Sequence, residues 1–296
     1  MLDKIVKKMP WTNRWHIDPS THTVSIKPGP GEAYDKDTWT RAIREQLSEA
    51  RSKGTFTVLK GWRNEEYAIA NSLGIDARME RSGSPLFGII TFGVHMTAYT
   101  HTSDGMRIWV PRRSPTKQTY PSMLDNTVAG GMAAGEEPYG CMVREAGEEA
   151  SLPSQLIKDK ITACGTVSYW HERDERAGGE VGMMQPECQY IYDLELPAEV
   201  TPKPSDDEVA GFELLSIDQV EKALERREFK PNCALVMIDF LIRHGKVPAS
   251  EQNSLFDIVP RLHRRLRFDC GMSDIARPDL SFPSGRQHRF VPRCAQ

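Results

Sequence analysis

Acidic side chains gather in one short segment of the chain, residues 130–152, which reads GGMAAGEEPYGCMVREAGEEASL. Pro138 can occupy the first turn of a helix. A helix that starts there places Glu145, Glu148 and Glu149 at positions i, i+3 and i+4, so the three carboxylates share one face. They repel one another unless a hard divalent cation lies among them. The pattern therefore predicts an oxygen-rich site for magnesium or manganese.

Two neighbouring features complete the predicted site. Arg144 precedes Glu148 by four residues, so its guanidinium can hold that carboxylate in a charge-assisted pair, and we count it with the catalytic residues. Glycines at 130 and 131 let the backbone turn tightly, which allows the carbonyl of Gly130 to approach the metal. An acidic cluster on a helix is usually a solvated face. Here Glu136 and the later glutamates stand at fixed offsets after a glycine turn, which favours a functional site.

The segment resembles the Nudix box, the signature of a superfamily that hydrolyses nucleoside diphosphates linked to another group. Two positions depart from that signature: Ser151 stands where the box has Gly, and Ala146 is a small residue at an aliphatic position. Ser151 lies at the predicted end of the helix, away from the carboxylates, so it concerns the loop shape more than the chemistry. The resemblance implies a Nudix α/β/α sandwich, Mg²⁺ or Mn²⁺ as the cofactor, and hydrolysis of a phosphoanhydride.

Further blocks resemble a fungal and plant subgroup of Nudix proteins, related to the Nudix portion of certain thiamine pyrophosphokinases. The likeness covers roughly residues 58–245, and the first 55 residues match it poorly. The blocks are GWRNEEYAI, FGVHMTAY, IWVPRRSPTKQTYPSMLDNTVAGGM, DDEVAGFELL and FKPNCALVMIDFLIRHG. Ser122 is a departure, because the subgroup commonly has Gly there. This resemblance implies removal of the terminal phosphate from thiamine diphosphate or, preferentially, from its oxidised analogues.

Basic side chains just before the box are predicted to bind the substrate. Arg112, Arg113 and Lys117 follow one another on a strand end and a loop. An anionic diphosphate needs cationic partners, and arginine offers a two-pronged fork for phosphate oxygens. The similar isopentenyl diphosphate isomerases hold a diphosphate with basic residues in this region. We therefore predict that Lys117 and one of the two arginines grip the terminal phosphates.

The attacking water needs a general base, and two carboxylates are candidates. Nudix enzymes often take a further metal ligand or base from a loop after the box, and Glu208 lies in such a loop. Glu149 is expected to be chiefly a metal ligand, because it lies one turn from Glu145 and beside Glu148. Glu145 and Glu208 both stay open as the base. The long loop 170–184 is a candidate mobile lid.

Four other features receive interpretations of their own. In the loop, Trp170 is interpreted as a packed aromatic in preference to a stacking platform. GWRNEEYAI is interpreted as structural. Residues 1–30 look irregular, whereas residues 37–52 have helical spacing that Gly54 is placed to end. TFTVLKGW is predicted as a short β-type run.

The remaining elements follow from periodicity. Strands are predicted at 86–100, 106–113, 161–169 and 188–196, and helices at 216–228 and 232–244, with another in LFDIVPRLHRRL. The fold class is therefore α/β. We predict an N-terminal α+β region over 1–85, the Nudix domain over 86–245, and a C-terminal extension over 246–296. That extension is predicted to be helical and then irregular, and it is basic, with nine Lys/Arg against five Asp/Glu.

Composition excludes several classes of protein. The formal net charge is −3, so no global field points to nucleic acid or an anionic membrane. The sequence contains no run of 18 apolar residues, so no membrane span is predicted. The N-terminus is not predicted to be a secretory signal. The six scattered cysteines include no C-x-x-C pair, which indicates reduced thiols. We expect a cytoplasmic enzyme whose partner is a small-molecule diphosphate, as a monomer or a homodimer.

Three other functions stay open. A Nudix hydrolase of isoprenoid diphosphates, ADP-ribose or nucleotides is the first, and a prenyl chain would require an apolar tunnel. An isomerase of similar fold is the second, although the expected catalytic Cys is absent from the glycine turn, which reads VAGG. A non-catalytic diphosphate-binding module is the third. The intact Arg144 and box glutamates argue against it.

Overall fold

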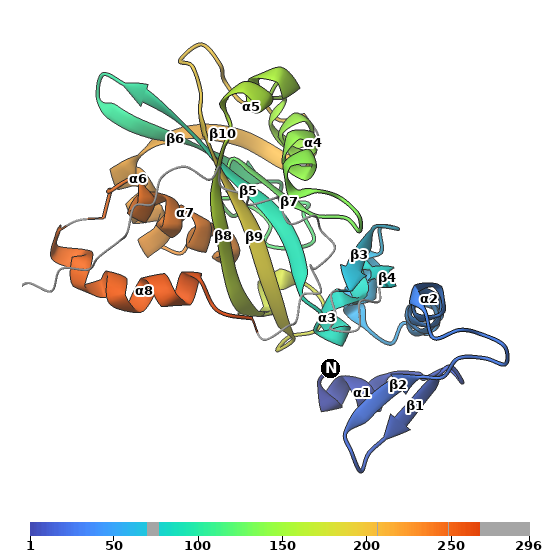
Figure 1. The fold of residues 1–296 in the computed structure, drawn as a ribbon. Coiled ribbons are helices and arrows are strands. Elements are labelled where there is room, and N and C mark those ends of the chain that lie inside the picture. Colours follow the sequence, from blue (N-terminus) through green and yellow to red (C-terminus); the bar gives the residue numbers. More distant parts are fainter. Residues whose placement is uncertain (70–76, 206, 248, 267–296) are drawn as a thin grey trace, which may run out of the picture.

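A six-stranded mixed sheet forms the centre of the fold (Figure 1). The computed structural model describes residues 1–69, 77–205, 207–247 and 249–266. The strands stand in the order β10-β6-β5-β9-β8, and β7 pairs with β5. β5 runs parallel to β9, and the other neighbouring strands are antiparallel. The strand bounds are β5 Thr91–Thr102, β6 Gly105–Arg113, β7 Val128–Gly131, β8 Thr162–Glu172, β9 Met184–Glu195 and β10 Val209–Ser216.

Helices flank this sheet on both sides, which confirms the predicted α/β architecture. α4 and α5 pack around a core that contains Met96 and Met142, whereas α6 and α7 enclose a second core around Val110 and Phe240. Burial of these apolar side chains is the main force that holds the layers together. The predicted strands at 161–169 and 188–196 are β8 and β9. The helix bounds are α4 Pro138–Ala150, α5 Ser154–Lys160, α6 Ile217–Glu225, α7 Pro231–Arg243 and α8 Leu255–Leu262.

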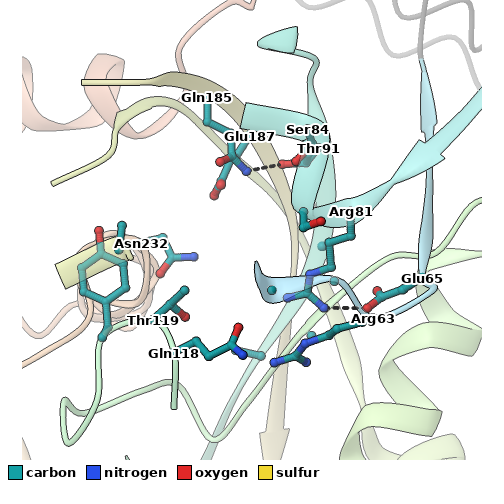
Figure 2. A pocket seen from close by; sticks show the side chains of 18 of the residues that line it. Arg63, Glu65, Arg81, Ser84, Thr91, Gln118, Thr119, Gln185, Glu187 and Asn232 are labelled. Atoms are coloured by element: carbon teal, nitrogen blue, oxygen red, sulfur yellow. Dashed lines mark hydrogen bonds and ion pairs between the residues drawn. The ribbon is translucent and has the colours of Figure 1, made fainter. Parts of the chain in front are cut away.

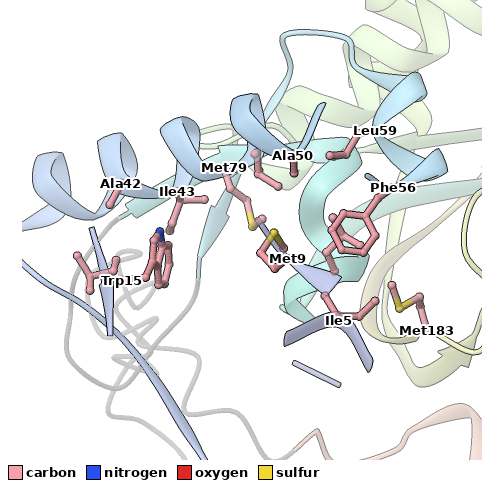
Figure 3. Close-up of a cluster of buried hydrophobic side chains, with 13 residues drawn as sticks. Ile5, Met9, Trp15, Ala42, Ile43, Ala50, Phe56, Leu59, Met79 and Met183 are labelled. Carbon is pink, nitrogen blue, oxygen red and sulfur yellow. The ribbon is translucent and has the colours of Figure 1, made fainter. Parts of the chain in front are cut away.

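A smaller α+β region lies at one end of the sheet (Figure 1). Its core packs the apolar face of α2 against α1, β1 and η1, and Figure 3 shows Met183, from the loop before β9, in the same cluster. This shared core fixes the region against the central sheet. The bounds are α1 Asp3–Lys8, β1 Trp15–Asp18, β2 Thr23–Ile26, α2 Lys36–Ser52, η1 Thr57–Gly61, β3 Glu66–Ile69, β4 Ala77–Glu80, η2 Arg81–Gly83 and α3 Ser84–Phe87.

The predicted helix at 37–52 is confirmed as α2, and its ends have identifiable causes. Asp35 caps the start, where its carboxylate accepts a hydrogen bond of 3.0 Å from the backbone N–H of Thr38. Ala42, Leu47 and other residues of one face are buried, as the periodicity requires. The chain leaves the helix through Gly54, whose φ is +60°.

Three predictions for short segments are wrong. Residues 1–30 contain α1 and the β1–β2 hairpin, TFTVLKGW contains the 3-10 helix η1, and the first residues of the strand predicted at 86–100 belong to α3. Elements of three to six residues are too short to show a period. Leu59 and Leu86 are buried in the N-terminal core, so tertiary packing selects these conformations.

The later parts of the chain follow the predicted order. The helices predicted at 216–228 and 232–244 are α6 and α7, and the helix predicted after residue 254 is α8, which follows the 3-10 helix η4 (Ala249–Ser254). The predicted tail from residue 268 lies outside the described residues. The predicted boundary at residues 85 and 86 falls within α3. None of the described helices is long and apolar enough to cross a membrane.

Candidate active site

A cavity of about 820 Å³ opens where the sheet, α4 and the N-terminal region meet. Its walls come from β5, the turn after β7, α4, the first half of β9, and the loops that follow β6 and β8. Figure 2 shows Arg63, Glu65 and Arg81 of the N-terminal region on one side of this space, with Glu187 and Asn232 on the other. A cavity of this size suits a small organic molecule.

The box helix is α4, and both of its ends match the local sequence. Pro138 stands in the first turn, where its missing N–H costs no hydrogen bond. At the other end Ser151 adopts the left-handed conformation, with φ 53°, and its N–H bonds to the carbonyl of Ala146. Glycine adopts that conformation without strain, so the Gly of the box signature has a physical reason. Ser151 keeps the shape at some cost in stability.

Arg144 links the box carboxylates to one another. Its Nε donates to Glu136 at 2.8 Å, and its Nη1 donates to Glu145 at 2.9 Å and to Glu148 at 2.8 Å. The pairing predicted between Arg144 and Glu148 is therefore present, and it extends to two further carboxylates. Glu148 itself is 56 % exposed.

Glu145 and Glu149 lie deeper, beside the two glycines, which belong to strand β7 and not to the tight turn predicted for them. The Glu149 carboxylate accepts a hydrogen bond of 2.8 Å from the backbone N–H of Ala129, and burial raises the pKa of Glu149 to about 8. Burial also raises the pKa of Glu145. A Cβ atom at Gly130 would overlap the Glu145 carboxylate, so only glycine allows this close approach.

The donor set fits a divalent cation, although no finished cage is present. In the described part of the chain, no three acidic, His or Cys side chains are grouped so that they could hold a metal ion. The physical reason is Arg144, which as the local positive charge draws Glu145 and Glu148 to itself. Glu149 is a buried carboxylate whose ionisation is penalised by nearby negative charge, and a hard cation would relieve that penalty.

Of the two arginines predicted to bind substrate, the structure places only Arg113 in the cavity wall. Arg113 lines the cavity, but its guanidinium is committed to Asp125, at 2.7 Å, and to the carbonyls of Thr119 and Tyr120. Arg112 does not line the cavity and bonds instead to Ser122 and Glu213. Neighbouring residues of a strand point to opposite faces, so only one of the two can face the site.

Lys117 and Glu208 meet in the cavity wall. They form an ion pair, and Glu208 is also 3.5 Å from Nη1 of Arg63. Burial lowers the pKa of Lys117, whereas the nearby charge of Lys117 outweighs burial and lowers the pKa of Glu208. Both residues predicted from the sequence therefore line the site, and Glu208 joins Lys117 to the N-terminal region.

The inner end of the cavity is polar. Gln189 donates to the hydroxyl of Tyr169 at 3.0 Å, and that hydroxyl donates to Glu187 at 2.5 Å. Gln185 donates to Thr91 at 3.3 Å. The Oε1 atom of Gln189 is buried and has no hydrogen-bond partner among the described residues. Glu187 is the acidic acceptor of this network, and it lines the cavity.

The loop 170–184 lines the cavity and is fastened to the N-terminal region. The Glu180 carboxylate accepts hydrogen bonds from the N–H groups of Thr57, at 2.6 Å, and Val58, at 3.0 Å. Trp170 is 42 % exposed and does not line the cavity, so it is not placed as a stacking platform for a bound substrate. The side chain at the next position, His171, lines the site and lies 3.1 Å from the Tyr120 hydroxyl.

Comparison with known proteins decides the family. A family model of the NUDIX domain matches residues 92–233, and a model of a domain of unknown function (DUF4743) matches residues 15–91. Nudix hydrolase 20, chloroplastic, of Arabidopsis thaliana is 37% identical over 234 residues, which are 78% of this chain and 59% of that protein. The chain is a member of the Nudix superfamily.

Two further relatives cover much of the same sequence. An uncharacterized protein of Saccharomyces cerevisiae is 38% identical over 260 residues, which are 86% of this chain and 75% of that protein. Nudix hydrolase 24, chloroplastic, of Arabidopsis thaliana is 34% identical over 235 residues, which are 78% of this chain and 60% of that protein. The Nudix chain thus spans about three-fifths of the length of its two plant relatives.

The NUDIX family model and the two plant relatives named as Nudix hydrolases indicate a pyrophosphohydrolase. Nudix hydrolases generally use divalent metal ions, which agrees with the oxygen donors of α4 beside β7. The spacing of the box predicted its carboxylates, whereas Lys117 was predicted from its charge and its place just before the box. It interpreted GWRNEEYAI as structural, yet Arg63, Glu65 and Tyr67 from that block line the cavity.

Proposed function

We propose that this Nudix protein hydrolyses thiamine diphosphate or, preferentially, its oxidised analogues to the monophosphate and inorganic phosphate, with magnesium or manganese as the cofactor. The observation that carries the choice of substrate is the inner end of the cavity. There Glu187 lines the cavity and accepts hydrogen bonds from the Tyr169 hydroxyl and the Gln189 amide. Its carboxylate is an acceptor, and it favours an organic group that carries N–H donors, such as an aminopyrimidine ring.

The same lining disfavours the isoprenoid alternative. A prenyl chain gains its affinity from apolar burial, whereas Thr91, Gln185 and Gln189 line the deep part of this cavity. Leaving buried polar groups without partners against a hydrocarbon chain would cost binding energy. ADP-ribose and nucleotides also carry N–H donors, so they are the competing substrates that matter.

The box residues supply the chemistry in this proposal. Glu148 and Glu149, with the carbonyl of Gly130, would hold the cation, and Glu145 is kept for proton transfer. When bound, the cation neutralises charge that develops on the phosphate oxygens. Lys117 holds a terminal phosphate oxygen. A carboxylate within hydrogen-bond reach takes the proton of the attacking water.

Of the two candidate bases, Glu145 is the better placed. Glu208 is committed to Lys117 and Arg63, so its role is to position Lys117 at the phosphates. Glu145 lies against strand β7 and lines the cavity beside Glu149. Its proton transfer accompanies attack of the water oxygen on the terminal phosphorus, and the bridging oxygen leaves with the organic monophosphate.

Product formation from a panel of diphosphates, followed by mass spectrometry, tests the proposal. The panel contains thiamine diphosphate, its oxidised analogues, ADP-ribose, nucleoside diphosphates and geranyl diphosphate, each with magnesium, with manganese and with a chelator. The oxidised thiamine compounds should give the highest kcat/KM, and mass spectrometry should find the monophosphate. A higher kcat/KM for ADP-ribose, a nucleotide or the prenyl compound would reject this substrate assignment.

A variant links the substrate to the cavity. Glu187→Gln should lower kcat/KM for the thiamine compounds by about 10-fold, because one charged hydrogen bond is lost. Glu172→Gln is the matched control, since Glu172 is exposed on β8 and does not line the cavity. Equal kinetics in the two variants would show that Glu187 does not contact the ring.

A further inference from the structure

The arginines near the box are held within the protein. Every side-chain nitrogen of Arg113 has a partner, in Asp125 or in the loop carbonyls that follow β6. Every side-chain nitrogen of Arg144 likewise bonds to box carboxylates or to Cys141. Among the described residues, the other cations that line the cavity are Lys60, Lys117, Lys230, Arg63, Arg81 and Arg173.

Of these cations, Arg81 of the N-terminal region has the geometry to contact a ligand. It lines the cavity, and its Nη1 donates to Glu65 at 2.8 Å while its guanidinium stands 5.6 Å from the ring centre of Tyr67 (Figure 2 shows the ion pair). Among the described residues, no other side-chain nitrogen of Arg81 has a hydrogen-bond partner. The side chain is 39 % exposed. Glu65 and Tyr67 thus orient a fork whose remaining donors are open to a ligand.

Direct contacts fix Arg81 beside the box. The hairpin that precedes it docks on the box loop, where the N–H of Ala134 donates to the carbonyl of Glu66 at 2.8 Å. A Cβ atom at Gly131 would overlap the hydroxyl of Tyr67, so the hairpin touches strand β7 itself. The position of Arg81 is therefore set against β7, the strand that Glu145 and Glu149 of α4 also contact.

We propose that Arg81 binds a phosphate group of the substrate, so that the N-terminal region supplies part of the active site. The proposal rests on the proposed function only in that the ligand is a diphosphate, and it holds for any organic group. A guanidinium suits this task because its N–H groups match two phosphate oxygens at once. The domain of unknown function, which matches residues 15–91, thereby gains a role in binding.

A purely structural role makes a different prediction. If the pair of Arg81 with Glu65 only fastened the hairpin, its loss would lower stability slightly, as for other exposed ion pairs, and would leave ligand binding unchanged. Arg44 offers a matched control. It pairs with Glu66 of the same hairpin at 2.5 Å, but it does not line this cavity.

The test measures binding of methylenediphosphonate, a diphosphate mimic that cannot be hydrolysed, to the full chain by calorimetry with magnesium. Arg81→Ala should weaken binding by about 10- to 100-fold, Arg81→Lys should be intermediate, and Arg44→Ala should match the unchanged protein. Thermal unfolding of each variant checks the fold. With a hydrolysed diphosphate as substrate, the Arg81→Ala variant should show a raised KM with a smaller change in kcat.

Two outcomes would overturn the proposal: equal binding by Arg81→Ala and Arg44→Ala, or no binding of the mimic to the unchanged protein. Failure of the proposed function looks different. Should no thiamine compound be hydrolysed while the mimic still binds in an Arg81-dependent way, the substrate assignment fails and the phosphate contact stands. Full binding by Arg81→Lys together with loss in Arg81→Ala would show that charge alone suffices, which contradicts the proposed fork.

Discussion

At the scale of single residues, Arg144 explains how the box carboxylates can lie close together. The guanidinium bonds to Glu136, Glu145 and Glu148, and so it satisfies carboxylates that would otherwise repel one another. A divalent cation competes for one of the same groups, Glu148. Arg144 therefore helps to set the positions of the carboxylates that would bind the cation and take the proton.

We predict that a magnesium titration of Glu→Gln variants distinguishes the metal ligands of the box from the general base. Glu149→Gln should lose activity that excess magnesium partly restores, because it weakens metal binding. The variant that removes the base should lose about 100- to 10,000-fold in turnover, which magnesium does not restore. We expect Glu145→Gln, not Glu208→Gln, to behave in that way. Near-normal turnover in both Glu145→Gln and Glu149→Gln would favour the binding-module alternative.

Lys117 is the basic residue near the box with the clearest role in substrate binding. Lys117→Ala should lower kcat/KM by about 10- to 150-fold, because one charged contact to phosphate is lost. Lys53→Ala is the control, since Lys53 forms an exposed pair with Glu49 on α2. Unchanged kinetics in Lys117→Ala would mean that Glu208 and Lys117 form a structural pair only.

Arg113 should act on stability, and the effect should depend on pH. The Arg113 and Asp125 side chains are 10 % and 9 % exposed, so Arg113→Ala leaves a buried carboxylate without its partner and should cost about 3–5 kcal/mol. Burial opposes ionisation of Asp125, but the charges of Lys230 and Arg113 outweigh it and hold the pKa of Asp125 below its ordinary value.

The sign of this pH dependence follows from the lowered pKa. Asp125 contributes its stability above the unfolded pKa of about 3.9, and the contribution is lost as pH falls through the lower pKa of the folded state. Denaturant unfolding should show the largest difference between the two proteins near pH 7, shrinking below about pH 4. A difference that does not change with pH would rule out this account.

Some residues of the site could be predicted from local sequence, and others could not. The box glutamates and Arg144 lie within one helix, so the 3.6-residue period alone places them together. Arg81, Glu187 and Gln189 come from separate elements, and nothing in their local sequence marks them as neighbours. Arg112 is the opposite case: its sequence position predicted a place in the site, but neighbouring residues of a strand point to opposite faces, and Arg112 points away from the cavity.

At the scale of elements, two serines stand where related sequences have glycine, and both adopt positive φ: Ser122 at +60° and Ser151 at +53°. Each keeps a turn that glycine would form without strain. We predict that Ser151→Gly stabilises the protein by about 0.5–1 kcal/mol, whereas Ser151→Val destabilises it. Thermal unfolding measures both changes. If Ser151→Gly lowers Tm, the serine side chain contributes more than its backbone costs.

Long elements were predictable from their period, and short ones were not. The box helix α4 and the helix α2 show clear helical periods. The cap residue of α4, Ser151, has a positive φ, and the cap residue of α2, Lys53, is followed by Gly54, which has a positive φ. η1 and α3 are set by tertiary contacts, since Leu59 and Leu86 are buried among residues that lie far apart in the sequence. The β1–β2 hairpin is likewise held by Trp15 and Ile26 in that core.

At the scale of the whole molecule, the N-terminal region and the Nudix sheet share one core and one cavity. Met183 of the Nudix domain is buried in the N-terminal core, and Lys4 donates to the carbonyl of Val181 at 2.9 Å. The loop 170–184 therefore joins the two parts while its residues line the site. Stability and substrate binding should be coupled through it.

Glu180 is the residue through which that coupling can be measured. Its carboxylate accepts both N–H groups at the start of η1, Thr57 and Val58, and hydrogen bonds to a charged group each contribute about 1.5–3 kcal/mol. We predict that Glu180→Ala lowers stability, speeds hydrogen exchange in η1 and raises KM, because Val58 and Gly179 line the same cavity. Glu175→Ala is the control, since Glu175 is exposed in the same loop. Faster exchange in η1 with an unchanged KM would show that the two parts are joined for stability alone, whereas a raised KM without faster exchange would place Glu180 in direct contact with the substrate.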